Sequence, residues 1–166
     1  LTIEELDNCV DQLLDVILAL TGKNEERKHS FDEKMHHELA GRAAAESAVL
    51  LKNQDHILPL KPKTNVAVIG DFAFEPRYQG AGSSVVNPTF VETMEKQLER
   101  YDIQVVGMSR GYIRTGGADA AMRKGALDLA KEAEVVIYCF GLDEISESEG
   151  LDRTHMRIPQ NQIELL

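Results

Sequence analysis

Apolar residues near the start of the chain recur at every third or fourth position, the spacing of one face of a helix. Residues 2–20 show this spacing at Leu6, Val10, Leu13, Leu14 and Ile17. Thr2 and Glu5 stand at the spacing of a capping box, in which each residue's side chain accepts a hydrogen bond from the other's backbone amide. We therefore predict a helix over residues 2–20.

A polar stretch over residues 21–30 interrupts this pattern and is predicted to be a linker. A second helix is predicted over residues 31–51, opened by another capping box at Ser30 and Glu33. Its many small residues suit close packing against another element. Residues 52–64 contain two prolines and no periodicity, which indicates an extended connector.

Short β-branched runs and helical patterns then alternate along the chain. The predicted strands are residues 65–70, 103–109 and 134–141. The predicted helices are residues 88–101, residues 117–133 and a last helix opened by Pro159. Alternation of this kind predicts an α/β fold, with a mostly parallel sheet, flanking helices and right-handed crossovers. The two N-terminal helices precede this sheet.

Composition and charge narrow the possible partners. The 166 residues are 43% hydrophobic and 28% charged, as in a soluble globular domain, and the net charge is -10. This charge argues against nucleic acid and anionic membranes as partners, because both need clustered Lys and Arg. Cys9 and Cys139 are predicted to be buried free thiols. No zinc-type cluster or membrane-length apolar run is present, so we expect neither a metal, a cofactor nor a membrane span.

The two ends of the chain suggest a piece of a longer protein. The chain starts with Leu1 and an acidic amphipathic stretch, and it stops inside the helix-like run "PQNQIELL". No signal peptide is visible in these residues, which favours the cytoplasm without fixing the compartment of a longer protein.

Two long loops leave the carboxyl ends of the predicted strands, where α/β sheets meet their ligands. The first, over residues 71–87, contains "GAGSS". This segment lacks the Lys-Ser/Thr of a phosphate-binding Walker loop, and it does not open directly into a helix as a dinucleotide fingerprint does. Either it needs glycine dihedral angles only, or its backbone approaches a ligand. Arg77, Tyr78, Ser83 and Ser84 are then the polar contacts.

The second loop, over residues 142–158, is strongly acidic. Its carboxylates are Asp143, Glu144, Glu147, Glu149 and Asp152. Their spacing does not fit a calcium loop, so a solvated acidic loop and a catalytic site remain as alternatives. In a catalytic site, crowding and partial desolvation raise the pKa of one carboxyl until it serves as a general acid near neutral pH. His155 shares this loop, and Asp152 with Arg153 is predicted to be a structural pair.

Five ordered segments carry a resemblance to a known family. They are "AAAESAVLLKNQDHILPL", "VAVIGDFA", "YQGAGSS", "GLDEISESEGLDR" and "IPQNQIELL". In this order they resemble the second domain of glycoside hydrolase family 3, which includes β-glucosidases and β-xylosidases. The resemblance implies a helical interdomain region over residues 1–60 and an incomplete α/β sandwich domain over residues 61–166.

The resemblance also implies a retaining glycosidase that removes terminal β-D-glycosyl residues. In that family a (β/α)8-type barrel carries the nucleophilic Asp, and a loop of the sandwich domain supplies the acid/base Glu. Glu149 matches the acid/base position, with Glu147 as the competing match. Gly82, Ser83 and Ser84 match a loop that borders the sugar pocket.

This chain departs from the family because its sequence contains no barrel. We therefore expect the isolated chain to be inactive, with the missing barrel domain and a β-linked glucoside or oligosaccharide as partners of the parent enzyme. A truncated sheet exposes an edge and an apolar face, so we also expect a homo-oligomer. The competing hypothesis is a non-catalytic α/β module that binds a sugar or a nucleotide.

Overall fold

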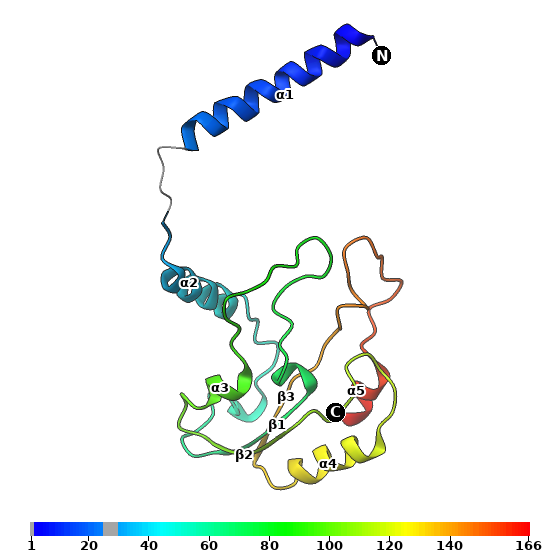
Figure 1. The fold of residues 1–166 in the computed structure, drawn as a ribbon. Coiled ribbons are helices and arrows are strands. Elements are labelled where there is room, and N and C mark those ends of the chain that lie inside the picture. The colour runs from blue at the N-terminus through cyan, green and yellow to red at the C-terminus, as the bar shows by residue number, and fades with distance from the viewer. Residues whose placement is uncertain (1, 25–29) are drawn as a thin grey trace. The chain divides into compact units, whose positions relative to one another are not determined.

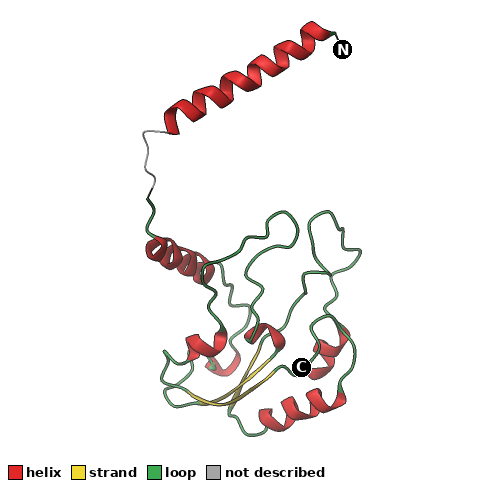
Figure 2. Cartoon of the chain, in the orientation of Figure 1, coloured by secondary structure: helices red, strands yellow, loops and turns green. Residues whose placement is uncertain are grey.

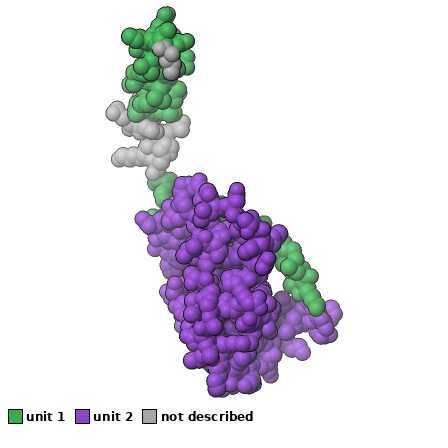
Figure 3. Space-filling view, turned by 90° about the vertical axis from the view of Figure 1, so that its right-hand side faces the viewer, with its two compact units in different colours: residues 1–52 green, residues 53–166 purple. Residues whose placement is uncertain are grey.

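In the computed structural model of the protein, residues 2–24 and 30–166 are described. It divides into two compact units, Leu1–Lys52 and Asn53–Leu166 (Figure 3). Of the predicted linker, residues 25–29 lie outside the described residues.

Two helices make up the first unit, as predicted. Helix α1 spans Ile3–Asn24, and its capping box is confirmed, because the Thr2 amide donates to Glu5 Oε2 at 2.8 Å and the Glu5 amide donates to Thr2 Oγ at 3.2 Å. No helix among the described residues is long and apolar enough to cross a membrane. Cys9 is exposed on α1, so its predicted burial is wrong.

Helix α2 spans Glu33–Glu46, which is shorter than the predicted 31–51. Its N-cap is Asp32, which accepts a hydrogen bond from the Met35 amide at 3.0 Å, so the predicted cap at Ser30 is wrong. At the other end, the Ser47 hydroxyl donates to the Ala43 carbonyl at 2.7 Å. The Ser47 amide donates to the same carbonyl at 3.0 Å, and Ser47 is the C-cap at which the helix ends.

The second unit is built on a parallel sheet of three strands in the order β2-β1-β3 (Figure 1). The strands are β1 (Asn65–Ile69), β2 (Gln104–Ser109) and β3 (Val135–Tyr138). The other elements are η1 (Gln54–His56), η2 (Asp71–Ala73), α3 (Met94–Leu98), α4 (Ala120–Ala130) and α5 (Gln160–Leu165). This confirms the predicted α/β fold with a parallel sheet and flanking helices.

Strand β1 lies at the centre because it is apolar on both faces. Its residues from Val66 to Ile69 are all buried, whereas β2 and β3 are only partly covered. Successive side chains of a strand point to opposite faces. Val68 accordingly packs in one core cluster with Leu98 of α3, and Ile69 packs in another with Ala126 of α4 and Leu165 of α5.

Two helices are shorter than the apolar pattern predicted. The predicted helix 88–101 reduces to α3, since only Met94 and Leu98 reach the core while Phe90 stays half exposed. The predicted helix 117–133 reduces to α4, whose N-cap Asp119 accepts from the Met122 amide at 2.8 Å. Both helices end where tertiary packing and capping place their ends, and the spacing of apolar residues gives no information on either.

Helix α5 directly follows the loop of residues 142–158 and fixes the position of its C-terminal end. Pro159 is the N-cap of α5, which confirms the predicted start. The Tyr138 hydroxyl donates to the Gln162 carbonyl at 2.7 Å, and the Gly141 amide donates to Gln162 Oε1 at 2.9 Å. Burial raises the pKa of Tyr138 to about 12, so it donates as a neutral phenol at physiological pH. The loop of residues 142–158 therefore starts and ends beside the same edge of the sheet.

Candidate functional site

The loops after β1 and β3 run side by side beyond the carboxyl edge of the sheet (Figures 1 and 2). We call residues 71–87 the first loop and residues 142–158 the second loop. Parallel strands end at the same edge, so segments far apart in sequence meet there. The second loop carries Glu149 and Glu147, and the first carries Gly82, Ser83 and Ser84. The structure therefore brings the predicted site residues to one region.

Ser83 contacts Glu149 directly. The Ser83 amide donates to Glu149 Oε2 at 2.8 Å, and the Ser83 hydroxyl donates to the same oxygen. The Glu149 amide donates to the Ala81 carbonyl at 3.4 Å. Gly82 permits this approach, because its φ is +93° and an added Cβ would lie 2.7 Å from Glu149 Cβ. In the "GAGSS" segment, Gly82 thus allows the backbone to approach a glutamate of the same chain.

The two hydrogen bonds from Ser83 lower the pKa of Glu149 below its usual value, the hydroxyl contributing more than the amide. Glu149 is otherwise exposed to solvent. Crowding and partial desolvation among the carboxylates of the second loop predicted the opposite direction, a raised pKa. That expectation is wrong for this arrangement, because donors on neighbouring segments bind the ionised form and burial is slight.

Glu147 lies between two guanidinium groups. Arg77 of the first loop approaches Glu147 Oε2 at 3.0 Å, and Arg153 approaches Glu147 Oε1 at 3.5 Å. Arg153 also donates to the His155 carbonyl at 3.0 Å. The predicted pairing of Arg153 with Asp152 is therefore wrong. Each carboxylate oxygen of Glu147 has a cationic partner, which leaves this residue poorly placed to give and take a proton.

A charged cluster around Asp71, which was not predicted from the sequence, lies at the same edge of the sheet. Asp71 is 8% exposed and pairs with Arg110 and with Arg114, whose Nε is 2.5 Å from Asp71 Oδ2. Arg110 also reaches Glu75 at 2.7 Å, and Arg114 reaches Glu144 of the second loop at 3.3 Å. One feature of the sequence could have indicated this cluster. Arg110 directly follows β2, so it lies at the carboxyl edge of the sheet, where Asp71 follows β1.

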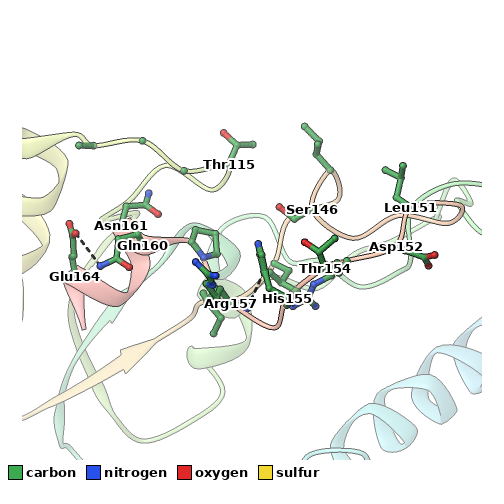
Figure 4. A pocket seen from close by; sticks show the side chains of 18 residues that line it. Thr115, Ser146, Leu151, Asp152, Thr154, His155, Arg157, Gln160, Asn161 and Glu164 are labelled. Carbon is green, nitrogen blue, oxygen red and sulfur yellow. Dashed lines mark hydrogen bonds between the residues drawn. The ribbon is translucent and has the colours of Figure 1, made fainter.

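A cavity lies beside this region, away from Glu149. It measures about 870 Å³ and is lined by residues of the 115–118 segment, the second loop and α5 (Figure 4). His155 and Asp152 line it, and His155 Nδ1 accepts from the Arg157 amide at 3.3 Å. The candidate acid/base Glu149 does not line this cavity.

The described residues of the two loops offer no cluster of metal ligands, and the Ser83 amide is not free for a phosphate. Within the described residues, no three side chains of His, Cys, Asp or Glu gather closely enough to hold a metal ion. A phosphate cradle needs free backbone amides, but the Ser83 amide already donates to Glu149. The arrangement instead presents an exposed carboxylate at a sheet edge, which suits proton transfer or polar recognition.

The fold is a parallel α/β sheet with flanking helices, the class of fold in which ligands meet the loops at the carboxyl ends of the strands. Residues 48–166 match the family profile of the Glycosyl hydrolase family 3 C-terminal domain, and the chain belongs to this family.

Relatives of the chain are glycosidases of several specificities. It is 41% identical to thermostable beta-glucosidase B of Acetivibrio thermocellus, over 97% of this chain and 22% of that protein. It is 37% identical to an exo-alpha-(1->6)-L-arabinopyranosidase of Bifidobacterium breve, over 100% of this chain and 23% of the relative. A probable exo-1,4-beta-xylosidase of Aspergillus clavatus is 39% identical, over 78% of this chain and 16% of the relative.

A solved structure shows the same fold. The crystal structure of a Bifidobacterium adolescentis GH3 beta-glucosidase superposes with a TM-score of 0.82 and 37% sequence identity, covering 99% of this chain and 24% of the other. The chain thus spans less than a quarter of the length of these two β-glucosidases, 22% and 24%.

Proposed function

We propose that this chain is part of a retaining β-glycosidase of the β-glucosidase type, in which Glu149 is the acid/base. The observation that carries the proposal is the exposed Glu149 carboxylate, which the first loop holds at the carboxyl edge of a glycosyl hydrolase family 3 domain. Glu147 is the alternative, but both its oxygens are engaged by arginines. A β-glucoside is the substrate we favour, because a relative and a solved neighbour are β-glucosidases.

Retaining hydrolysis needs two carboxyl groups about 5–5.5 Å apart. In the proposed enzyme, an Asp of a barrel domain outside these 166 residues attacks the anomeric carbon. Glu149 gives its proton to the departing glycosidic oxygen, and its carboxylate later takes a proton from the water that releases the sugar. Gly82, Ser83 and Ser84 border the sugar in this arrangement. The Ser83 hydroxyl keeps lone pairs with which it accepts hydrogen bonds from sugar hydroxyls.

The proposal is tested by comparing the full-length enzyme with the isolated 166-residue chain. We expect the full-length enzyme to hydrolyse an aryl β-glucoside and to release β-glucose first, as seen by proton NMR before mutarotation. We expect the isolated chain to show no enzyme-like hydrolysis, because half of the carboxyl pair is absent. First release of α-glucose would contradict retention. Enzyme-like turnover by the chain alone would contradict the assignment of the nucleophile to another domain.

Binding measurements separate this proposal from a non-catalytic module. We expect the isolated chain to bind glucose or a nucleotide only at millimolar concentration or not at all, because in the proposed enzyme most sugar contacts belong to the barrel domain. Micromolar binding of a nucleotide in calorimetric titration would favour the binding-module hypothesis.

Ser83 offers a test through pH. In the full-length enzyme, Ser83→Ala removes the hydroxyl donor that lowers the pKa of Glu149. The pKa of Glu149 should rise, so the acid stays protonated to higher pH and the basic limb of kcat/KM moves to higher pH. The measurement is the pH profile of kcat/KM beside that of the unmodified enzyme. A basic limb that stays in place or moves to lower pH would contradict the contact.

A further inference from the structure

We propose that Arg77 is a positioning residue for Glu149, because its guanidinium fastens the backbone of the second loop from which Glu149 projects. This inference rests on the proposed function of Glu149 as the acid/base. It extends that function to a residue of the first loop that has no contact with the reacting carboxylate itself.

The guanidinium of Arg77 makes three hydrogen bonds to the second loop. Nη1 donates to the Leu142 carbonyl at 3.2 Å and to Glu147 Oε2 at 3.0 Å, and Nη2 donates to the Glu147 carbonyl at 2.9 Å. Two of the three acceptors are backbone carbonyls, so the contact fixes the path of the chain as well as one side chain. The Leu142 carbonyl lies at the start of the loop and the Glu147 carbonyl lies two residues before Glu149.

The position of the Glu147 backbone constrains Glu149 strongly. Two residues of chain span at most about 7 Å, so an anchored carbonyl at Glu147 limits where the Glu149 backbone can lie. On the first loop, Ser83 follows Arg77 by six residues and holds the Glu149 carboxylate. Residues 77–83 therefore contact the second loop at the Glu147 backbone and at the Glu149 carboxylate. Together the two contacts orient the Glu149 side chain.

The chemistry of arginine suits this role. Its planar guanidinium presents several donors in a fixed fork, which a lysine ammonium cannot reproduce. The Arg77 side chain is 18% exposed, compared with 51% for Glu147. Arg77 thus lies in the contact between the two loops, and its guanidinium donates hydrogen bonds to the second loop. It would therefore affect a substrate only by positioning Glu149.

The test uses three variants in the full-length enzyme: Arg77→Ala, Arg77→Lys and the matched control Arg100→Ala. Arg100 is an exposed arginine outside both loops, 3.7 Å from Glu92. With a β-glucoside that has a poor leaving group, we expect Arg77→Ala to lower kcat about 10–100-fold with little change in KM, since misplacing a catalytic group by about 1 Å costs up to about 10²-fold. With a dinitrophenyl β-glucoside, whose leaving group needs no acid, kcat/KM should fall much less, because kcat/KM reports the glycosylation step alone.

Two further measurements distinguish positioning from a general loss of stability. Arg77→Ala should speed hydrogen exchange of the amides in residues 143–149, whereas Arg100→Ala should leave them unchanged. Added guanidinium ion should restore part of the activity of Arg77→Ala, and Arg77→Lys should recover less than that because it restores charge without the fork. Equal losses of kcat/KM on both leaving groups, a change in KM alone, or unchanged exchange in residues 143–149 would overturn the inference.

The failure of this inference differs from the failure of the proposed function. Glu149→Gln is measured in the same assays. If Glu149→Gln shows the leaving-group dependence and the Arg77 variants do not, the positioning role is wrong and the acid/base assignment stands. If Glu149→Gln has no effect, the proposed function is wrong, and the positioning role falls with it.

Discussion

Replacing Glu149 by Gln in the full-length enzyme is expected to lower kcat about 10²–10⁴-fold on β-glucosides with poor leaving groups, the usual contribution of general acid catalysis. Such leaving groups depart as alkoxides unless they are protonated, and a glutamine has no proton of the required acidity. Dinitrophenyl β-glucoside should lose far less activity in the glycosylation step, because its leaving group departs without protonation. The measurement is kcat and kcat/KM over a series of aryl β-glucosides.

Azide separates Glu149 from its neighbour. In Glu149→Ala, azide can replace water without general base assistance, so turnover of the activated substrate should recover and β-glucosyl azide should form. Glu147→Ala should give no azide product, although it loses the contact with Arg77. Asp152→Asn is a matched control, because it removes a carboxylate of the same loop that has no part in the proposed chemistry. Azide rescue of Glu147→Ala and not of Glu149→Ala would move the assignment to Glu147.

The lowered pKa of Glu149 bears directly on this mechanism. A general acid must be protonated near the working pH, yet the contact with Ser83 favours the carboxylate. A second carboxylate about 5 Å away, as retaining hydrolysis requires, would act in the opposite direction because like charges disfavour ionisation. In the proposed enzyme the acid therefore depends on the partner domain for its protonation, and Ser83 favours the ionised form needed as base in the second step.

The sequence predicted the parts of the fold that depend on local pattern. Val66 to Ile69 form an unbroken apolar run, which marks a strand buried on both faces, and the structure makes it the central strand. Thr2 with Glu5 was recognisable for the same reason, because a capping box is read from residues three apart. The helix predicted over 88–101 is too long, because the apolar pattern extends over more residues than the core buries. Only the part around Met94 and Leu98, which pack in the core, is helical.

The candidate site was only partly predictable. The sequence placed both loops at the carboxyl edge, and the family resemblance selected Glu149 and Ser83 as members of one region. The direct bond between these two residues depends on a glycine dihedral angle and on loop paths, which no residue pattern records. The same holds for the ion pairs of Asp71, because Arg110 and Arg114 follow it by 39 and 43 residues in the sequence.

Replacing Gly70 by Ala is expected to destabilise the sheet unit by about 3 kcal/mol or more, from backbone strain and overpacking together. Gly70 ends β1 with a φ of +126°, and an added Cβ would lie 1.9 Å from the carbonyl oxygen of Cys139 and 2.8 Å from its carbon. That carbonyl oxygen also accepts the Tyr112 hydroxyl at 2.5 Å. No side-chain rotation relieves a clash between Cβ and backbone, so β1 and β3 must separate at the edge where both loops begin.

Gly125→Ala is the matched control for this prediction. Gly125 lies within α4, where an added Cβ meets no atom within 4 Å. Alanine there should stabilise the unit by about 0.5–1 kcal/mol, because it lowers the entropy of the unfolded chain without a clash. Urea unfolding followed by circular dichroism measures both changes from the shift of the midpoint at constant slope. A Gly70→Ala midpoint equal to that of the unmodified chain would show that β1 and β3 do not approach as closely as the structure places them.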